Sequence, residues 1–340
     1  MIYAIWNNKG GVGKTFLTFV MGCEYALLHP ECKVVIIDLC PQANVSELVL
    51  GGNGTGSKNL DKLLNSQPRR KTIGGYFDER IRNPNNVTGN ESWYSINPKQ
   101  QHYNENMPEN LYLVAGDPSL ELQSQVINQI SILSQPQDIW KNAHYWVKDM
   151  IQGIKTQLGD DTMFFLDCNP SFASYTELAV VAAERLIVPC SADGSSARAI
   201  DNIGRLIYGL NVPSQYINSS FHNKVQSFQI SLPPIHIICL DRSTQYDTRP
   251  AQAFLAMFDE VKKRVTNLAT SGSVPFSSEV EKCFIDIPDA HTVSVVISYL
   301  GIPISNLRAG RYNINGRDTQ VNQVPLERYS SSIQKLIASL

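Results

Sequence analysis

The sequence predicts a doubly wound α/β fold, with a mostly parallel central sheet and helices on both faces. Short runs rich in Val, Ile and Phe, with little polar alternation, are typical of parallel strands buried on both sides. Helical patterns separate successive runs, which is the order that such a fold requires. The expected strands are 2–6, 34–38, 111–115, 163–167, 185–189, 235–240 and 283–287.

Helical periodicity fills most of the intervals between these strands. Pro250 is expected in the first turn of its helix, where a missing N–H leaves no bond unmade. The expected helices are 14–28, 120–133, 139–158, 175–183, 196–208, 250–265 and 292–300.

Residues 1–340 are expected to form one domain carrying two insertions and a C-terminal helix. The stretches 51–110 and 211–234 are rich in turn-forming residues, and neither has enough periodic apolar residues for a core of its own. We therefore interpret both as surface insertions. Residues 325–340 place their apolar side chains on one helical face.

The composition indicates a globular protein in a reducing compartment. The chain has 340 residues, 43% of them hydrophobic, and a net charge of −2, so no global basic field predicts nucleic-acid binding. Its seven cysteines are scattered without a C-x-x-C pair, which argues against disulfides and zinc. Without a recognisable signal peptide or a long apolar stretch, we expect a cytoplasmic protein.

A glycine-rich loop follows the first expected strand and opens the first expected helix. Residues 8–15 read Asn-Lys-Gly-Gly-Val-Gly-Lys-Thr, which fits the phosphate-binding pattern except that Asn8 replaces its first glycine. Glycines turn backbone N–H groups toward phosphate oxygens, and the helix N-terminus favours negative charge. Lys14 would contact the β and γ phosphates of ATP, or the β phosphate of ADP, and Thr15 would contact Mg²⁺.

Three further segments, together with the extra Lys9, make the chain resemble the ParA/MinD family of deviant Walker A ATPases. Residues 34–44 end in Asp-Leu-Cys-Pro-Gln-Ala-Asn and resemble the second motif of that family. Residues 163–171 resemble its Walker B strand, and residues 111–120 resemble the strand and turn between these two motifs. The resemblance runs from residue 2 to about 200 and continues loosely at 235–241 and 284–288.

Lys9 is the residue that the resemblance makes most informative. The resemblance implies that Lys9 reaches across a homodimer interface to the nucleotide of the partner, so that ATP binding drives dimerisation. The alternative is a solvated lysine beside the loop.

Asp38 and Asp167 each end an apolar strand, at the sheet edge where α/β proteins bind ligands. Either carboxylate could hold Mg²⁺ directly or through water, and Asp167 is the stronger candidate. The alternative for each is a cap on the following segment. We assign Lys9, Lys14 and Asp38 to catalysis, and Thr15, Asp167 and Asp38 to the metal.

Cys40 stands where the resembled motif has a second aspartate. A thiol with a pKa near ~8.5 is a poor proton acceptor at neutral pH, and Mg²⁺ prefers oxygen. We expect slow but real hydrolysis, since phosphoryl transfer depends mainly on positioning and charge neutralisation. Two alternatives stay open: another group orients the water, or Cys40 only fills space.

Asp241 and Pro288 lie in the looser part of the resemblance and are candidates for contacting the base. The full nucleotide-binding set expected is Lys9, Gly10, Gly11, Val12, Gly13, Lys14, Thr15, Phe16, Asp241 and Pro288.

The resemblance implies that the ATP-bound dimer binds DNA without sequence preference and responds to a ParB-like adaptor protein. Such binding would depend steeply on salt, and the protein would then associate with the nucleoid. The candidate phosphate contacts are Lys262, Lys263, Arg264, Arg308 and Arg311, with Arg317 and the cluster 69–71 as further basic positions.

Membrane binding is the main alternative. The helix at 325–340 carries only Arg328 and Lys335 as basic residues, opposed by Glu327, so a helix packed on the domain is favoured over a MinD-like membrane helix. An iron–sulfur protein would need paired cysteines, and neither Cys168 nor Cys190 has a glycine-rich setting of that kind. A nucleotide-dependent scaffold with little hydrolysis remains, supported only by Cys40.

Overall fold

The computed structural model describes residues 1–133, 138–243, 245–246, 249–250 and 252–340. Its central feature is an eight-stranded sheet in the order β10-β7-β6-β1-β5-β2-β4-β3. Seven strands run parallel and β3 pairs antiparallel with β4 at one edge, which confirms the mostly parallel sheet. The strands are β1 Ile2–Ile5, β2 Val34–Leu39, β3 Ser95–Ile96, β4 Leu111–Val114, β5 Met163–Cys168, β6 Arg185–Ser191, β7 Ile235–Ser243 and β10 Phe284–Pro288.

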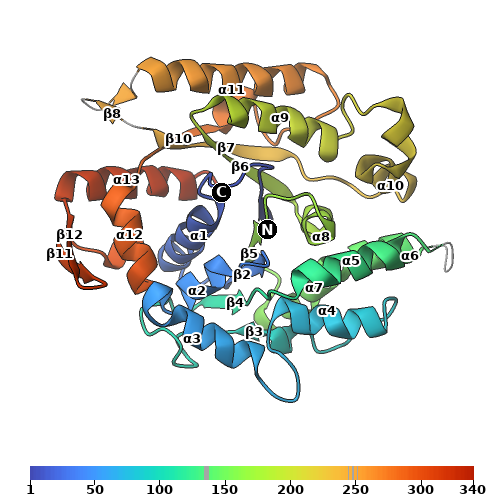
Figure 1. Ribbon diagram of the computed structural model, residues 1–340, viewed down its shortest axis with the longest axis horizontal. Coiled ribbons are helices and arrows are strands. Elements are labelled where there is room, and N and C mark those ends of the chain that lie inside the picture. The colour runs from blue at the N-terminus through green and yellow to red at the C-terminus, as the bar shows by residue number, and fades with distance from the viewer. Residues whose placement is uncertain (134–137, 244, 247–248, 251) are drawn as a thin grey trace.

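Helices cover both faces of this sheet (Figure 1). The strand side chains alternate between two cores. On β1, Ala4 points toward one core, while Tyr3 and Ile5 point toward the other. Every residue of β1, β2 and β5 is buried, as expected for strands covered on both sides.

The first core is covered by the helices α4 Ile73–Arg82, α5 Leu120–Ser131, α6 Ile139–His144, α7 Trp146–Leu158, α8 Ser174–Ala182, α9 Gly194–Leu206, α10 Phe221–Ser227 and α11 Gln252–Thr270. The second is covered by α1 Lys14–Leu28, α2 Asn44–Val49, α3 Gly52–Leu64, α12 His291–Leu300 and α13 Gln323–Ile337. Single 3₁₀ turns occur at η1 Glu91–Tyr94, η2 Ser214–Ser219, η3 Val280–Cys283 and η4 Ile304–Asn306.

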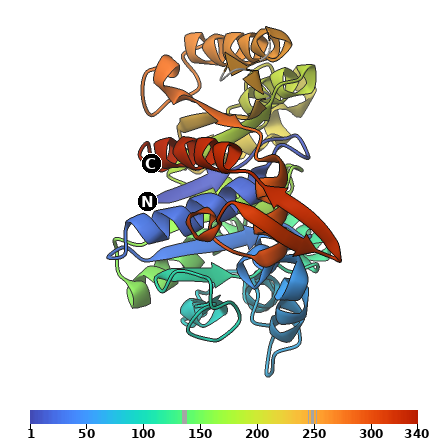
Figure 2. The ribbon, with the colours of Figure 1, turned by 90° about the vertical axis from the view of Figure 1, so that its left-hand side faces the viewer.

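A separate hairpin, β11 Gly310–Ile314 and β12 Arg317–Val321, lies beside α12 (Figure 2). Asn315 and Gly316 form its tight turn, both with positive φ, as a two-residue hairpin turn requires. A second short hairpin pairs β8 Gln245–Tyr246 with β9 Arg249–Pro250.

The segment 51–110 is more structured and more buried than its composition predicts. It holds α3, α4, η1 and β3, and Tyr76, Phe77 and Tyr94 are fully buried in the first core. Its apolar residues are few but bulky, so they join the main core instead of building a separate one. The segment 211–234 is mostly exposed and is held to the domain by Phe221 and Val225.

Two helix predictions need correction. The single helix expected at 139–158 is broken at Tyr145, because buried His144 stacks on Trp140 and bonds Glu177, while Trp146 turns to donate to Pro84 O at 3.0 Å. Pro250 does not lie in the first turn of a helix: it belongs to β9, and α11 begins at Gln252.

Candidate nucleotide-binding site

The loop 6–13 joins β1 to α1 and is fixed to the neighbouring strands. Trp6 Nε1 donates to Asn169 O at 2.9 Å, and Asn7 Nδ2 donates to Pro189 O at 2.6 Å. Gly11 and Gly13 adopt left-handed φ values of +73° and +78°, which most residues with a side chain avoid. The loop therefore has the tight curve that directs backbone N–H groups toward a bound anion.

Lys14 begins α1 and folds back into this loop. Its Nζ donates to Lys9 O at 2.7 Å, and the side chain is buried. Burial lowers the pKa of Lys14, and the nearby charge of Asp167 partly opposes that effect. A buried ammonium group in a glycine-rich loop is well placed for the β and γ phosphates, as the sequence predicts.

Lys9 points away from the interior of its own loop. Its Nζ forms an ion pair with Asp193 and donates to Ser191 Oγ at 2.7 Å and to Ser196 Oγ at 3.4 Å. Asp193 also caps α9 by accepting from the backbone N–H groups of Ser195 and Ser196, each at 3.0 Å. Burial alone would raise the pKa of Asp193, but the bonds from Lys9 and the cap hold it well below its usual range.

These partners of Lys9 are site residues that sequence reasoning missed. The available signal was the run Ser191-Ala-Asp-Gly-Ser-Ser196 after an apolar strand, which reads as a helix cap. Only the fold shows that β6 lies beside β1 and so brings the run to Lys9.

Asp167, near the end of β5, is fully buried and has few hydrogen-bond partners. Its Oδ1 accepts a long bond from Thr18 Oγ1 at 3.4 Å, and its Oδ2 has no hydrogen-bond partner in the structure described. Burial and the charge of Asp38 raise the pKa of Asp167, while Thr15, Lys14 and Thr18 act in the opposite direction. A buried carboxylate with one partnerless oxygen, beside the Thr15 hydroxyl, fits Mg²⁺, which takes few protein ligands and completes its shell with water and phosphates.

Asp38 is the register partner of Asp167 on the neighbouring strand, but its oxygens are fully used. Oδ1 accepts from Cys40 N at 3.0 Å, and Oδ2 accepts from Ser46 N at 3.0 Å and Ser46 Oγ at 2.6 Å. Burial raises the pKa of Asp38 in spite of these bonds. The geometry favours Asp38 as the residue that holds the turn 40–46, and it favours Asp167 for the metal.

Cys40 faces the site as a neutral thiol. Burial, followed by the charges of Asp38 and Asp167, raises its pKa to about 12, and Asn169 Nδ2 donates to its sulfur at 3.5 Å. A protonated thiol cannot accept a proton from an attacking water.

A pocket of about 580 Å³ is lined by the phosphate loop from Gly11 to Thr15 and by Cys40, whereas Asp38 and Asp167 lie buried behind its wall. Beyond the phosphate loop and Phe16, it is lined by residues of α2, α3 and α12 that the sequence did not single out. These are Asn44, Glu47, Leu48, Asn53 and Ser298, with Gln42, Cys168, Asn169 and Pro170 closer to the loop.

Asp241 lies near the loop, and neither Asp241 nor Pro288 lines this pocket. Asp241 Oδ2 lies so close to Gly13 that a Cβ there would be 2.2 Å away, whereas Pro288 is buried at the end of β10. Their contact with a base stays a prediction.

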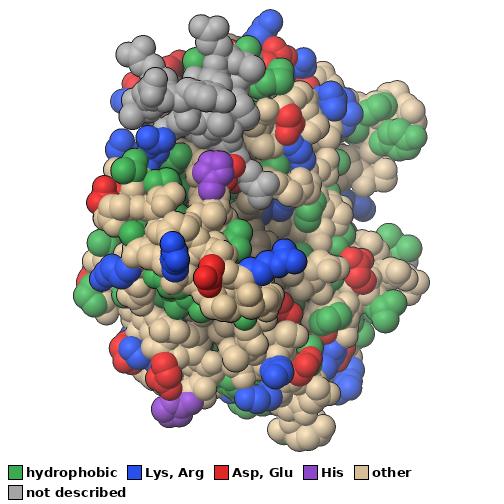
Figure 3. Space-filling view, turned by 60° about the vertical axis from the view of Figure 1, so that its left-hand side comes forward, with side chains coloured by type: hydrophobic (Ala, Val, Ile, Leu, Met, Phe, Trp, Pro, Cys, Tyr) green, Lys and Arg blue, Asp and Glu red, His purple; other side chains and the backbone are tan. Residues whose placement is uncertain are grey.

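The candidate DNA-binding residues differ in whether their positive charges are already paired with carboxylates. Arg264 is paired with Asp201 at 2.8 Å and with Glu260 at 2.9 Å, and Lys262 lies 6.0 Å from the Phe284 ring. Arg308 donates to Ser305 O at 2.9 Å. On the face shown in Figure 3, basic and acidic side chains are interspersed and no single basic patch stands out.

The C-terminal helix buries its apolar face in the second core, through Leu326, Tyr329, Ile333, Leu336 and Ile337. Within the part of the chain that the structure describes, no helix combines the length and the apolarity needed to cross a membrane. The helix packed on the domain, as expected, runs from Gln323 to Ile337.

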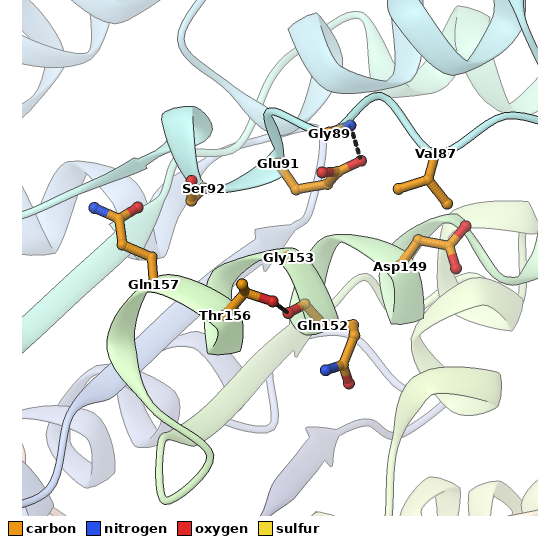
Figure 4. A pocket seen from close by; sticks show the side chains of 9 residues that line it. All are labelled: Val87, Gly89, Glu91, Ser92, Asp149, Gln152, Gly153, Thr156 and Gln157. Atoms are coloured by element: carbon orange, nitrogen blue, oxygen red, sulfur yellow. Dashed lines mark hydrogen bonds between the residues drawn. The ribbon is translucent and has the colours of Figure 1, made fainter.

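A second pocket, of about 480 Å³ between the loop 87–92 and α7, is separate from the phosphate loop (Figure 4). Its two carboxylates already have partners. Glu91 Oε1 accepts from Thr88 and Gly89 N–H groups, and Asp149 Oδ2 is 2.7 Å from Arg80. The nucleotide site is thus assigned by its loop chemistry and not by pocket size.

This fold and this loop define a P-loop nucleotide-binding protein with a deviant Walker A sequence. A family model described as an AAA domain matches residues 1–222. The chain belongs to that family, the ParA/MinD type of P-loop ATPases.

Solved structures agree with the fold at low sequence identity. Apo McdA from Cyanothece matches with a TM-score of 0.59 at 13% identity, covering 98% of each chain. A plasmid partition protein from Borrelia burgdorferi bound to AMPPNP matches with a TM-score of 0.54 at 15% identity, covering 100% of this chain and 99% of that one. A search of curated proteins found no match.

Proposed function

We propose that this protein is an ATP-dependent dimerising switch of the ParA type, which positions DNA or another large cargo. The observation that carries the proposal is the second lysine of the loop, since Lys14 occupies the loop interior while Lys9 lies outside it. The family membership and the likeness to a plasmid partition protein support the same proposal.

Each residue of the site has a stated part in this proposal. Backbone N–H groups of the loop 10–15 and the Lys14 ammonium bind the phosphates and neutralise their charge. Thr15 and Asp167 would hold Mg²⁺, which supplies further positive charge at the transferring phosphoryl group. Asp38 would act by holding the turn 40–46 beside them.

Lys9 must leave Asp193 before it can reach the nucleotide of a second copy. The two side chains are 21% and 45% exposed, so breaking their pair costs only on the order of 1 kcal/mol. A charge-assisted bond to a phosphate oxygen at a dry interface more than offsets this cost. When Lys9 exchanges Asp193 for a phosphate of the second copy, ATP binding would be coupled to dimerisation.

Slow hydrolysis is part of the proposal, because the thiol of Cys40 stays protonated at neutral pH. An adaptor protein would then set the lifetime of the ATP dimer. The same observation favours a second candidate function, a nucleotide-dependent scaffold with almost no turnover, and an ATPase assay with and without DNA separates the two.

Nonspecific DNA binding belongs to the proposal through the hairpin β11–β12. Arg311 and Arg317 are exposed there, whereas Arg264 is held by two carboxylates. Dimerisation would bring two copies of this hairpin together and strengthen a weak local positive potential. DNA binding would then fall steeply as the salt concentration rises.

The test is light scattering of the whole chain with ADP and with ATP. We expect a monomer with ADP and a dimer with ATP, and a Lys9→Ala variant that binds ATP yet stays monomeric. Lys14→Ala serves as the control that loses nucleotide binding itself. A wild-type protein that remains monomeric in both nucleotides contradicts the dimerising switch.

A further inference from the structure

A third pocket opens at the C-terminal end of α5. Its volume is about 690 Å³, which is within the range of roughly 300–1,000 Å³ that is usual for small-molecule sites. The helices α5, α6, α8 and α10, which contribute to its lining, lie together on one side of the molecule (Figure 1). We refer to it as the α10 pocket, and its lining includes Asn128, Ser131, Trp140, Glu177, Phe221 and Lys224.

Aromatic rings form the apolar wall of the α10 pocket. Trp140 stacks on Phe228, with ring centroids 5.5 Å apart, and on His144 at 3.7 Å. Phe221 packs edge-on against Phe172 at 5.3 Å. Trp140, His144 and Phe221 are buried, so these contacts hold the rings in place. The pocket therefore has a preformed wall for the apolar body of a ligand.

A buried hydroxyl without a hydrogen-bond partner also lines the pocket. Ser131, on α5, is only 8% exposed, and its Oγ makes no hydrogen bond within the part of the chain that the structure describes. Asn128 lies three residues earlier on the same face of α5 and accepts through Oδ1 from Ser174 Oγ at 2.6 Å, which leaves its amide N–H groups as donors. Because buried polar groups nearly always have partners, an unpaired one that lines a pocket is evidence for a ligand there.

His144 and Glu177 together contribute no net charge to the pocket. Nδ1 of His144 is 2.8 Å from Trp140 O, and Nε2 is 2.9 Å from Glu177 Oε2. A carbonyl and a carboxylate both accept, whereas a neutral imidazole donates from one nitrogen only. The pair therefore holds one additional proton, either as imidazolium with carboxylate or as imidazole with carboxylic acid. The sum of the two charges is zero in both cases.

Lys224 is then the remaining charge among the described residues that line the pocket. It lies on α10, is exposed, and forms no ion pair with any residue that the structure describes. The pocket thus combines an apolar wall with an unpaired hydroxyl, amide donors and one positive charge. This set of groups complements a carboxylate that is attached to an apolar body.

We propose that the α10 pocket binds a small amphiphilic carboxylate, which is a molecule with an apolar body and one negatively charged head group. The body would lie against Trp140 and Phe221, and the head group would accept hydrogen bonds from Ser131 and Asn128 near Lys224. Because four helices and the turn η2 enclose the site, it suits a small molecule better than a flat protein surface. The inference goes beyond the proposed function and does not rest on it, since other residues line the nucleotide pocket.

The test titrates the whole chain with 4-phenylbutyrate and, as the matched cation, with 4-phenylbutylamine. The two probes share an apolar body and differ in the charge of the head group. Calorimetry measures the affinities, and the indole N–H signal of Trp140 in NMR spectra locates the binding. We expect one equivalent of 4-phenylbutyrate to bind saturably and to shift this signal, and the amine to bind roughly tenfold more weakly because Lys224 repels it.

Two variants test the head-group contacts. Lys224→Gln should remove most of the preference for the acid, whereas Lys58→Gln, at an exposed lysine on α3 at the other face of the sheet, is the matched control and should change neither affinity. Ser131→Ala should weaken the binding of 4-phenylbutyrate about fivefold, because the acid loses a hydrogen bond. The melting temperature of this variant without the probe should not fall, since the hydroxyl makes no hydrogen bond in the structure described.

Any of four results would overturn the proposal. The acid fails to shift the Trp140 signal, or the amine binds as tightly as the acid. Lys224→Gln keeps the wild-type preference, which would place the head group away from this lysine. Ser131→Ala melts earlier than the wild type and binds the acid equally well, which would assign the hydroxyl to the stability of the fold.

Discussion

Strands β2 and β5 are neighbours in the sheet and end in aspartates at the same level, but the two carboxylates have opposite surroundings. Asp38 accepts three hydrogen bonds from Cys40 and Ser46, whereas Asp167 accepts one long bond and leaves Oδ2 without a partner in the structure described. Both are fully buried. A buried carboxylate with complete partners stabilises its turn, and one without them is suited to a cation.

This contrast separates two roles that the sequence pattern leaves together. The Asp38 carboxylate stabilises the folded chain, so its loss should lower the free energy of unfolding. We expect the Asp167 carboxylate to act when the nucleotide and Mg²⁺ are bound, so its loss should lower the rate of ATP hydrolysis. The following predictions test that division.

The largest effect is expected for Asp167→Asn. We expect magnesium-dependent ATP hydrolysis to fall about 10²–10³-fold, because a ligand of the metal that neutralises developing charge is lost. The melting temperature without nucleotide should be unchanged or higher, since the fold no longer buries a carboxyl group whose Oδ2 has no hydrogen-bond partner in the structure described. ATPase assays and thermal unfolding measure the two effects, and a variant that is both active and destabilised would reverse the assignment.

Asp38→Asn should have the opposite signature. The amide nitrogen cannot accept a hydrogen bond, so the variant loses either the bond from Cys40 or the two bonds from Ser46. We expect a loss of about 3 kcal/mol in unfolding free energy. Urea unfolding without nucleotide measures this loss. If the variant folds as stably as the wild type but fails to bind Mg²⁺, Asp38 is a metal ligand and the comparison fails.

Cys40→Asp tests the residue whose thiol is close to both carboxylates. We expect hydrolysis to rise about tenfold, since a carboxylate orients and deprotonates water better than a neutral thiol does. Stability without Mg²⁺ should fall, because a third carboxylate joins Asp38 and Asp167. Cys40→Ser is the matched uncharged control, and an unchanged rate for Cys40→Asp would indicate that Cys40 only fills space.

Thr18→Val should have the smallest effect. The bond from Thr18 to Asp167 is long, at 3.4 Å, so its removal should cost less than about 1 kcal/mol in urea unfolding. The isosteric change also removes the bond from Thr18 to Lys14 O within α1, which is a minor local contact. A loss as large as that of Asp38→Asn would show that Asp167 is better supported than the geometry indicates.

Much of the fold follows from local sequence. The helix predicted at 14–28 has the observed bounds, and the seven predicted strands all occur within a few residues of their expected ends. Apolar runs and helical periodicity report burial directly, and the central strands β1, β2 and β5 are buried throughout. The break at Tyr145 could not be predicted this way, because no proline or glycine marks it and His144 and Trp146 on either side contact Glu177 and Pro84, which are distant in sequence.

The order of residues in the loop was sufficient to predict phosphate binding, since glycines, a lysine and a helix start act through local backbone geometry. The sequence also showed that Cys40 replaces a carboxylate and that Lys9 is an additional charge. The tertiary structure alone decided which buried aspartate lacks partners, where Lys9 is held, and which side of α5 stays exposed. These features depend on donors and neighbours from strands and helices that are distant in sequence, and only folding brings them into contact.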